Sequence, residues 1–162
     1  MTAPTLPLTP VVTRAVASDV PQLVALNNLF SADGLTLARS EAFVNEHLQD
    51  YQVIRGPAGD VIGCVCVDEY SPSVAELVSL AVAPGAQGQG YGKLLIRAAE
   101  ALARKRGYPE LFAISLADTL FLSMGFAESH ISRYPEKINR YKAISKSELS
   151  IGKKFCFAVR FR

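Results

Sequence analysis

The stretch that most constrains this chain lies between residues 77 and 108, where three glycines separate a strand-like apolar run from a long helical pattern. Gly88, Gly90 and Gly92 stand at every second position of this junction. The first N–H groups of a helix have no partner within the helix and carry the positive end of its dipole. Glycines let such amides approach a ligand closely. Because each glycine costs about 1 kcal/mol relative to alanine wherever it falls in a helix, three of them predict a bound anion, and phosphate is a natural one.

Two common phosphate-binding motifs are excluded by the spacing of this junction. A Walker loop requires G-x-x-x-x-G-K-[ST], but Gln87 stands at its first glycine position and Leu94 follows Lys93. The dinucleotide fingerprint G-x-G-x-x-G, started from Gly88 and Gly90, would need its third glycine where Lys93 stands. The junction therefore belongs to another kind of phosphate site.

The order of predicted strands and helices indicates one α+β domain. The chain has 162 residues, a usual length for a single domain. Residues 1–10, rich in proline and threonine, are predicted to form a flexible arm, and residues 11–162 to form the domain. We expect a mixed central sheet of about six or seven strands with helices on both faces. Strands are predicted at 11–17, 51–56, 61–70, 75–83, 110–116, 126–134 and 153–161, and helices at 20–30, 41–50, 91–107 and 117–125.

Composition and hydropathy exclude several classes of protein. Hydrophobic residues make up 49% and charged residues 20% of the chain, which fits a globular protein and not a disordered one. No apolar run approaches the ~18 residues of a membrane span, and residues 1–12 lack the features of a secretory signal. Cys64, Cys66 and Cys156 form no disulfide framework, so we interpret them as small buried residues in a reduced, cytoplasmic setting. No metal site is predicted.

The C-terminal part of the chain is strongly basic. Residues 133–162 hold nine Lys and Arg against two Glu, a net charge of +7, while the rest of the chain is at −5. One interpretation is a solvated surface, and the other is a basic wall that faces an anionic ligand. Nucleic acid is less favoured because the segment lacks a known reader motif. The aromatic last strand could also pair with a second copy of the chain, which leaves a homodimer open.

The glycine junction matches the pattern Q-x-x-G-x-G over residues 87–92. With the preceding SLAVAP run and the later FLSMGF, the organisation from about residue 11 to 161 resembles the GNAT acetyltransferases. The resemblance implies a GNAT-like domain with acetyl-CoA as co-substrate, whose pyrophosphate lies on the amides of residues 87–93. It also implies a split in the sheet, where the pantetheine arm pairs with strand backbone at residues 80–82. The implied cofactor-binding residues are Leu80, Ala81, Val82, Gln87, Gly88, Gln89, Gly90, Tyr91, Gly92 and Lys93.

The same resemblance implies a direct acetyl transfer to an amine, which needs a base. Glu76 stands on the strand beside the expected thioester, where many family members carry a carboxylate; a salt-bridged or edge-exposed glutamate is the alternative. The family often protonates the leaving thiolate with a tyrosine, and Phe121 stands in its place. Ser115, Ser123, Tyr134 or bound water could substitute. The loss of this tyrosine also leaves open a relative that binds acetyl-CoA without turnover.

In finer detail the chain resembles the acetyltransferase domain of N-acetylglutamate synthases, which serve arginine biosynthesis. The stretches GLTLARSEAFV, AELVSLAVAP, ELFAISLADTLFLSMGF and YPEKI carry this similarity. It implies L-glutamate as the acceptor, with Arg39 and Lys137 binding substrate carboxylates, each with a plain surface residue as the alternative. Lys153 and Lys154 would add positive potential. Asp68 departs from the pattern, since related enzymes often carry a lysine there. A GNAT enzyme acting on another small amine or a protein N-terminus is the competing hypothesis.

Overall fold

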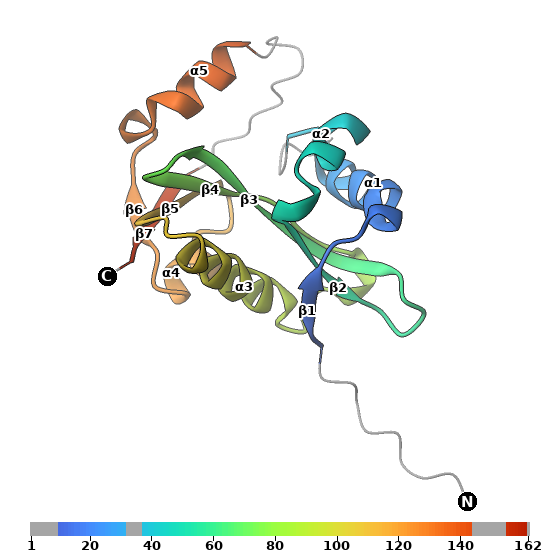
Figure 1. Cartoon of the computed structure of the whole chain (residues 1–162). Helices are drawn as coiled ribbons and strands as arrows, with labels where there is room; N and C mark the ends of the chain where they lie inside the picture. Colours follow the sequence, from blue (N-terminus) through green and yellow to red (C-terminus); the bar gives the residue numbers. More distant parts are fainter. Residues whose placement is uncertain (1–9, 32–36, 144–154, 162) are drawn as a thin grey trace, which may run out of the picture.

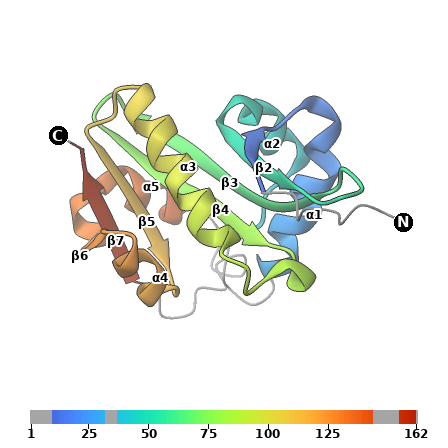
Figure 2. The same ribbon diagram turned by 90° about the horizontal axis from the view of Figure 1, so that it is seen from below.

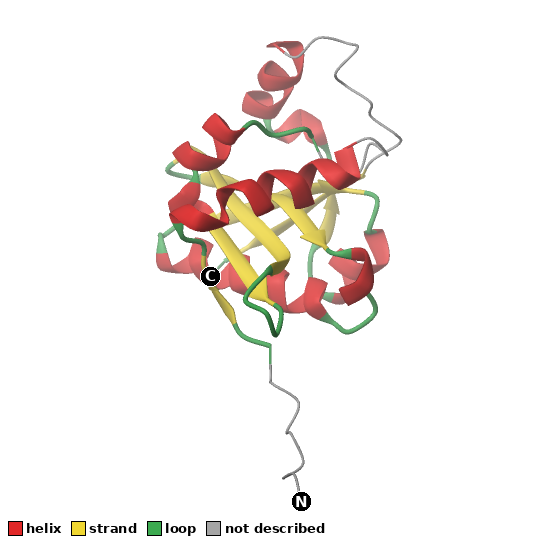
Figure 3. Ribbon diagram, turned by 90° about the vertical axis from the view of Figure 1, so that its right-hand side faces the viewer, coloured by secondary structure: helices red, strands yellow, loops and turns green. Residues whose placement is uncertain are grey.

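A computed structural model describes residues 10–31, 37–143 and 155–161 of the chain, and confirms an α+β fold built on one seven-stranded mixed sheet with the order β1-β2-β3-β4-β5-β7-β6 (Figures 1 and 3). The strands are β1 (Val12–Arg14), β2 (Tyr51–Arg55), β3 (Val61–Ser71), β4 (Val74–Val82), β5 (Glu110–Ser115), β6 (Ala127–Ser129) and β7 (Phe155–Arg160). The helices are α1 (Val20–Ser31), α2 (Glu41–Glu46), α3 (Tyr91–Lys105), α4 (Asp118–Ser123) and α5 (Pro135–Ala143). The predicted arm, apart from residue 10, and Lys153 and Lys154 lie outside the described residues.

Helices cover both faces of the sheet, as predicted. Figure 2 shows α3 lying across the strands, and its apolar stripe of Leu95, Ile96 and Ala99 is fully buried in the core on that face. Helices α1 and α2 cover the opposite face, where Leu23 and Val44 pack in a second core. We call these faces the α3 side and the α1 side. In α3 the apolar positions recur at helical spacing, so this helix buries one stripe, whereas α1 also buries the polar Asn27.

The central strands β4 and β5 part soon after they meet. They pair in parallel only at Ala75 with Leu111 and at Glu76 with Phe112. Beyond this point β4 continues to pair with β3, while β5 pairs with β7 along its whole length. The two strands therefore diverge and open the sheet at its centre, which is the split that the resemblance implied.

A β-bulge at Ser79 reverses the alternation of β4. Ser79 has a φ of 55°, in the left-handed region that a residue with a Cβ rarely adopts, and the register with β3 shifts at the same place. Before the bulge, Leu77 lies on the α3 side and Val78 on the α1 side. After it, Leu80 lies on the α3 side and Ala81 on the α1 side, whereas strict alternation would place them the other way round. The extra residue bends the strand where it leaves β5.

Several predicted elements are shorter than expected, and the strand predicted over 11–17 spans only Val12–Arg14. The segment 126–134 was predicted as a strand, but only Ala127–Ser129 is extended, and a 3₁₀ turn over Ile131–Arg133 follows. The turn begins there because the side chain of His130 accepts a hydrogen bond from the Ser132 amide, which competes with strand pairing. The helix predicted over 41–50 ends at Glu46, and a 3₁₀ turn over Leu48–Asp50 replaces its last part.

The three cysteines confirm their interpretation as buried residues. Cys64, Cys66 and Cys156 are all buried and free of disulfide bonds. Burial raises the pKa of the Cys64 thiol to about 12 and that of Cys156 to about 11, so both stay protonated near neutral pH. Within the described part of the chain, no helix combines the length and the apolar character that crossing a membrane requires.

Candidate active site

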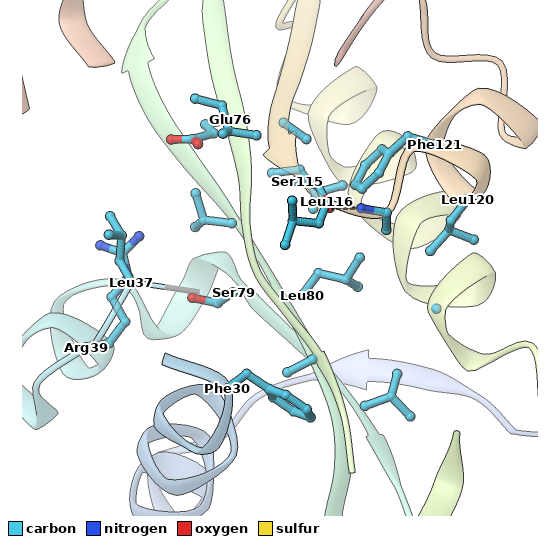
Figure 4. A pocket seen from close by; sticks show the side chains of 18 of the residues that line it. Phe30, Leu37, Arg39, Glu76, Ser79, Leu80, Ser115, Leu116, Leu120 and Phe121 are labelled. Carbon is cyan, nitrogen blue, oxygen red and sulfur yellow. Dashed lines mark hydrogen bonds between the residues drawn. The ribbon is translucent and has the colours of Figure 1, made fainter. Parts of the chain in front are cut away.

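A cleft with a volume of about 560 Å³ lies where β4 and β5 diverge (Figure 4). Its walls come from residues 76–82 of β4 and from residues 113–117, at the end of β5 and just after it. It reaches both sides of the sheet, because Phe30 of α1 and Gly92 at the start of α3 also line it. The opening is therefore a passage between the strands, large enough for a small organic group.

The glycine junction forms the start of α3 at one end of this cleft. A 3₁₀ turn over Pro84–Ala86 ends β4, and Gly90 is the residue that caps α3. Gly88 and Gly90 have φ angles of 80° and 82°, which only glycine adopts without strain. A Cβ at either position would meet no atom within 4 Å, so these glycines are not needed to avoid a steric clash within the protein. Both residues are exposed, as an anion site at a helix N-terminus requires.

The predicted cofactor-binding residues divide into two groups. Leu80, Ala81, Val82, Gln87 and Gly92 line the cleft. Gly88, Gln89, Gly90, Tyr91 and Lys93 do not line it and instead form the adjoining turn and first turn of α3. The Gln87 side chain donates a hydrogen bond of 3.1 Å to the carbonyl of Val82, so it ties the turn back to β4.

Glu76 lines the cleft beside the last pairing of β4 with β5. It is only 2% exposed, and its Oε1 accepts hydrogen bonds from the Tyr70 hydroxyl and from Lys137 Nζ, the latter at 2.9 Å. No described residue donates to its Oε2. The salt-bridged alternative raised from the sequence is thus present. The Oε2 of Glu76 nevertheless has lone pairs that no described donor uses, and the carboxylate lines the cleft. Tyr70 was missed, because a tyrosine at the end of a strand carries no distinguishing pattern.

Lys137 is a buried residue and not the plain surface lysine that was the alternative from the sequence. Its side chain is 4% exposed and lines the cleft next to Glu76. It projects from α5, which begins directly after Tyr134, and Tyr134 stacks on Phe112 of β5 with ring centroids 3.8 Å apart. This stack fixes the start of α5 over the sheet, so Lys137 reaches a carboxylate 61 residues earlier in the chain.

Arg39 lines the same cleft from the α1 side, together with Phe30 and Leu37 (Figure 4). Its guanidinium lies over the ring of Phe43, 4.2 Å from the centroid. Its Nε is buried and, among the described residues, has no hydrogen-bond partner. A planar guanidinium on the wall of a cleft is suited to a carboxylate ligand.

The chain matches the acetyltransferase (GNAT) family over residues 25–129. It belongs to the GNAT acetyltransferase family. This membership confirms the predicted enzyme class, an N-acetyltransferase with acetyl-CoA as its co-substrate.

Curated relatives of this GNAT chain include amino-acid acetyltransferases. It is 32% identical over 129 residues to an uncharacterized N-acetyltransferase of Chlorobaculum tepidum, covering 80% of this chain and 83% of the relative. It is 32% identical over 125 residues to the amino-acid acetyltransferase of Ralstonia nicotianae, covering 76% of this chain but only 28% of that enzyme. The amino-acid acetyltransferase of Mycobacterium tuberculosis is 28% identical, and the match covers 74% of this chain and 69% of that one.

Solved structures support the same fold at lower identity. Rv2747 from Mycobacterium tuberculosis, in complex with CoA and NLQ, has a TM-score of 0.81 at 23% identity, covering 94% of this chain and all of that one. N-acetylglutamate synthase from Neisseria gonorrhoeae, complexed with coenzyme A and N-acetyl-glutamate, has a TM-score of 0.82 at 24% identity, covering 97% of this chain and 36% of that one. At these identities the likeness establishes the GNAT fold.

The resemblance places Phe121 where the family often has a tyrosine, and no tyrosine among the described residues lines the cleft. Phe121 is buried against Phe126 and Phe157. Of the three candidates named from the sequence, only Ser115 lines the cleft, where its Oγ accepts a hydrogen bond of 3.0 Å from the Ala117 amide. Within the described ranges, no group of three or more His, Cys, Asp or Glu side chains is placed to hold a metal ion.

Proposed function

We propose that this GNAT enzyme acetylates the α-amino group of an amino acid, with L-glutamate as the leading acceptor. The observation that carries the proposal is the placement of a buried carboxylate, Glu76, and a guanidinium, Arg39, on the wall of one cleft between β4 and β5. The first can accept a proton from an amine, and the second can bind a carboxylate. An α-amino acid carries both groups.

Acetyl-CoA would lie along the diverging edge of β4. The amides of residues 87–93 at the start of α3 would bind its pyrophosphate, where the helix dipole stabilises negative charge. The backbone of residues 80–82 would pair with the pantetheine arm as an added strand does. Because Gln87 already occupies the Val82 carbonyl, this pairing would rest mainly on Leu80 and Ala81.

The transfer needs one proton acceptor and one proton donor. The amine nitrogen would attack the thioester carbonyl carbon while Glu76 takes an amine proton, directly or through water. A backbone N–H near Leu80 would stabilise the oxyanion of the tetrahedral intermediate. The C–S bond then breaks, and the thiolate takes a proton from Ser115 or from water.

Glutamate is favoured by the charges of the cleft and by the relatives. Arg39 and Lys137 are the cationic side chains among the described residues that line it, against one carboxylate, Glu76. This excess of positive charge suits an acceptor with a net negative charge. Arg39 would bind one substrate carboxylate, and Lys137 would add attraction for the second while it remains paired with Glu76. Phe121 supports a different function, an acetyl-CoA-binding protein without turnover, because the usual thiolate-protonating side chain is absent.

An amine panel distinguishes these functions. Thiol release from acetyl-CoA would be measured with glutamate, aspartate, glutamine, a polyamine and a peptide with a free N-terminus, and each product would be identified by mass. Rapid release with glutamate and formation of N-acetylglutamate support the proposal. Release only with a polyamine or the peptide would replace it by the competing GNAT activity. Acetyl-CoA binding without release for any amine would support the non-catalytic function.

Replacing Gly90 with valine is expected to weaken acetyl-CoA binding by at least tenfold, because the new side chain stands over the amides that would bind the pyrophosphate. The φ of 82° adds strain of about 1–2 kcal/mol for a residue with a Cβ. Gly107, at the other end of α3, offers a matched control, since its φ is 83° and it too has open space around it. Both variants should lose similar stability in thermal unfolding, but calorimetric titration should show weaker binding for Gly90→Val alone. Equal binding by the two would contradict the assigned pyrophosphate site.

A further inference from the structure

We propose that Asn28 is a positioning residue that holds Arg39 in the orientation needed to bind the acceptor's carboxylate. The proposal rests on the acceptor role given to Arg39 above. Asn28 lies near the end of α1, 11 residues before Arg39 in the chain. It lines no part of the cleft itself, so its influence on the acceptor would pass entirely through Arg39.

The side-chain amide of Asn28 pairs with the backbone of Arg39 at both of its polar groups. Arg39 N donates to Asn28 Oδ1 at 2.8 Å, and Asn28 Nδ2 donates to the Arg39 carbonyl at 3.0 Å. The neighbouring Asn27 donates to Asn28 Oδ1 at 3.0 Å, which fixes that atom as the acceptor. If the Asn28 amide were rotated by 180°, its NH₂ group would face the N–H groups of Arg39 and Asn27, and its oxygen would face the Arg39 carbonyl. The amide thus acts as an adjacent strand would, with two bonds to one residue.

Arg39 depends on this pairing because its own segment lies outside the helices and the sheet, which would otherwise supply backbone hydrogen bonds. Residues 37–40 lie between α1 and α2 in neither helix nor strand. Asn27 adds a bond of 2.7 Å to the carbonyl of Leu37, and Ser40 then caps α2 by accepting from the Phe43 amide. Asparagine is a poor residue for a helix interior, so two in succession in α1 indicate that their side chains serve this segment.

The far end of the Arg39 side chain is restrained as well. Its guanidinium rests on Phe43, whose ring also stacks on His47 at a centroid distance of 4.2 Å. Because the backbone is held by Asn28 and the head group by Phe43, the long side chain has few conformations left to lose when a ligand binds. A bidentate bond to a carboxylate depends on such orientation, so loosening the backbone should weaken binding of the acceptor and leave acetyl-CoA unaffected.

Kinetics of Asn28→Ala, with Gln22→Ala as the control, test this effect. Gln22 lies on the same helix, and its side chain also binds backbone elsewhere, accepting from the Val61 amide at 2.8 Å. We expect Asn28→Ala to raise the KM for the acceptor about tenfold with kcat and the KM for acetyl-CoA changed less than twofold, while Gln22→Ala changes none of them. In an Arg39→Ala background, Asn28→Ala should add nothing further. A full tenfold increase in that background would overturn the proposal.

A measurement on the free protein separates this inference from the proposed function. The Nε–H signal of Arg39, assigned by its loss in Arg39→Lys, is expected as a sharp, slowly exchanging resonance in the wild type and in Gln22→Ala. It should broaden or exchange rapidly in Asn28→Ala. An unchanged signal there would refute the positioning role. If the wild type acetylates no amino acid, the proposed function fails, but this resonance still decides whether Asn28 orders Arg39.

Discussion

Replacing Glu76 with glutamine is expected to lower kcat by about 10²- to 10⁴-fold, the usual contribution of a general base. Glutamine keeps the shape of the side chain but cannot accept a proton from the amine. Acetyl-CoA affinity should change little, because the residues proposed to bind the nucleotide lie at the other end of the cleft. Steady-state thiol release and calorimetric titration of acetyl-CoA check the two parts. Full activity of the variant at neutral pH would show that another group accepts the proton.

The variant needs a control for the lost ion pair. Glu76→Gln removes the carboxylate that pairs with the buried Lys137, whose Nζ lies 2.9 Å from Oε1 in the wild type. The double variant Glu76→Gln/Lys137→Met removes both charges and keeps the volume similar. If the loss of activity comes from the missing base, the double variant stays slow although its stability recovers. Recovery of kcat together with stability would instead assign the loss to misfolding around Lys137.

Lys137→Met alone is expected to lower the free energy of unfolding by about 3–5 kcal/mol, the range for breaking a buried ion pair on one side. The penalty arises because Glu76 stays buried with the Tyr70 hydroxyl as its remaining described donor. Urea unfolding of the wild type, both single variants and the double variant gives the coupling between the two residues. The double variant should be more stable than either single one. Additive losses would mean that the two side chains do not stabilise each other.

The sequence predicted the features whose cause is local. The glycine junction could be located because helix spacing after residue 91 and the alternating Gly88, Gly90 and Gly92 are visible within a short stretch. The central strand followed from an apolar run that Pro84 ends, and its carboxylate was singled out by the family resemblance. The seven-stranded sheet followed from the number of strand patterns together with the family resemblance.

The contacts between distant residues could not be predicted in this way. Nothing in the periodicity pairs Glu76 with a lysine 61 positions later, or makes Asn28 the partner of Arg39, because such pairs depend on how elements pack. The bulge at Ser79 was equally hidden, since a serine at positive φ carries none of the signal that a glycine would. The overlong strand at 126–134 failed because a histidine side chain competes for a backbone amide.

The reversal at Ser79 has a consequence for how two reactants could meet. Since β4 presents Glu76 toward the α1 side and, after the bulge, Leu80 toward the α3 side, one strand borders both mouths of the passage. An acceptor could arrive through the mouth beside Arg39 while the nucleotide stays at the mouth beside Gly92. Neither the acceptor nor the nucleotide would need to depart before the other enters. The acyl group could therefore pass directly between them in a ternary complex, without a covalent acyl-enzyme intermediate.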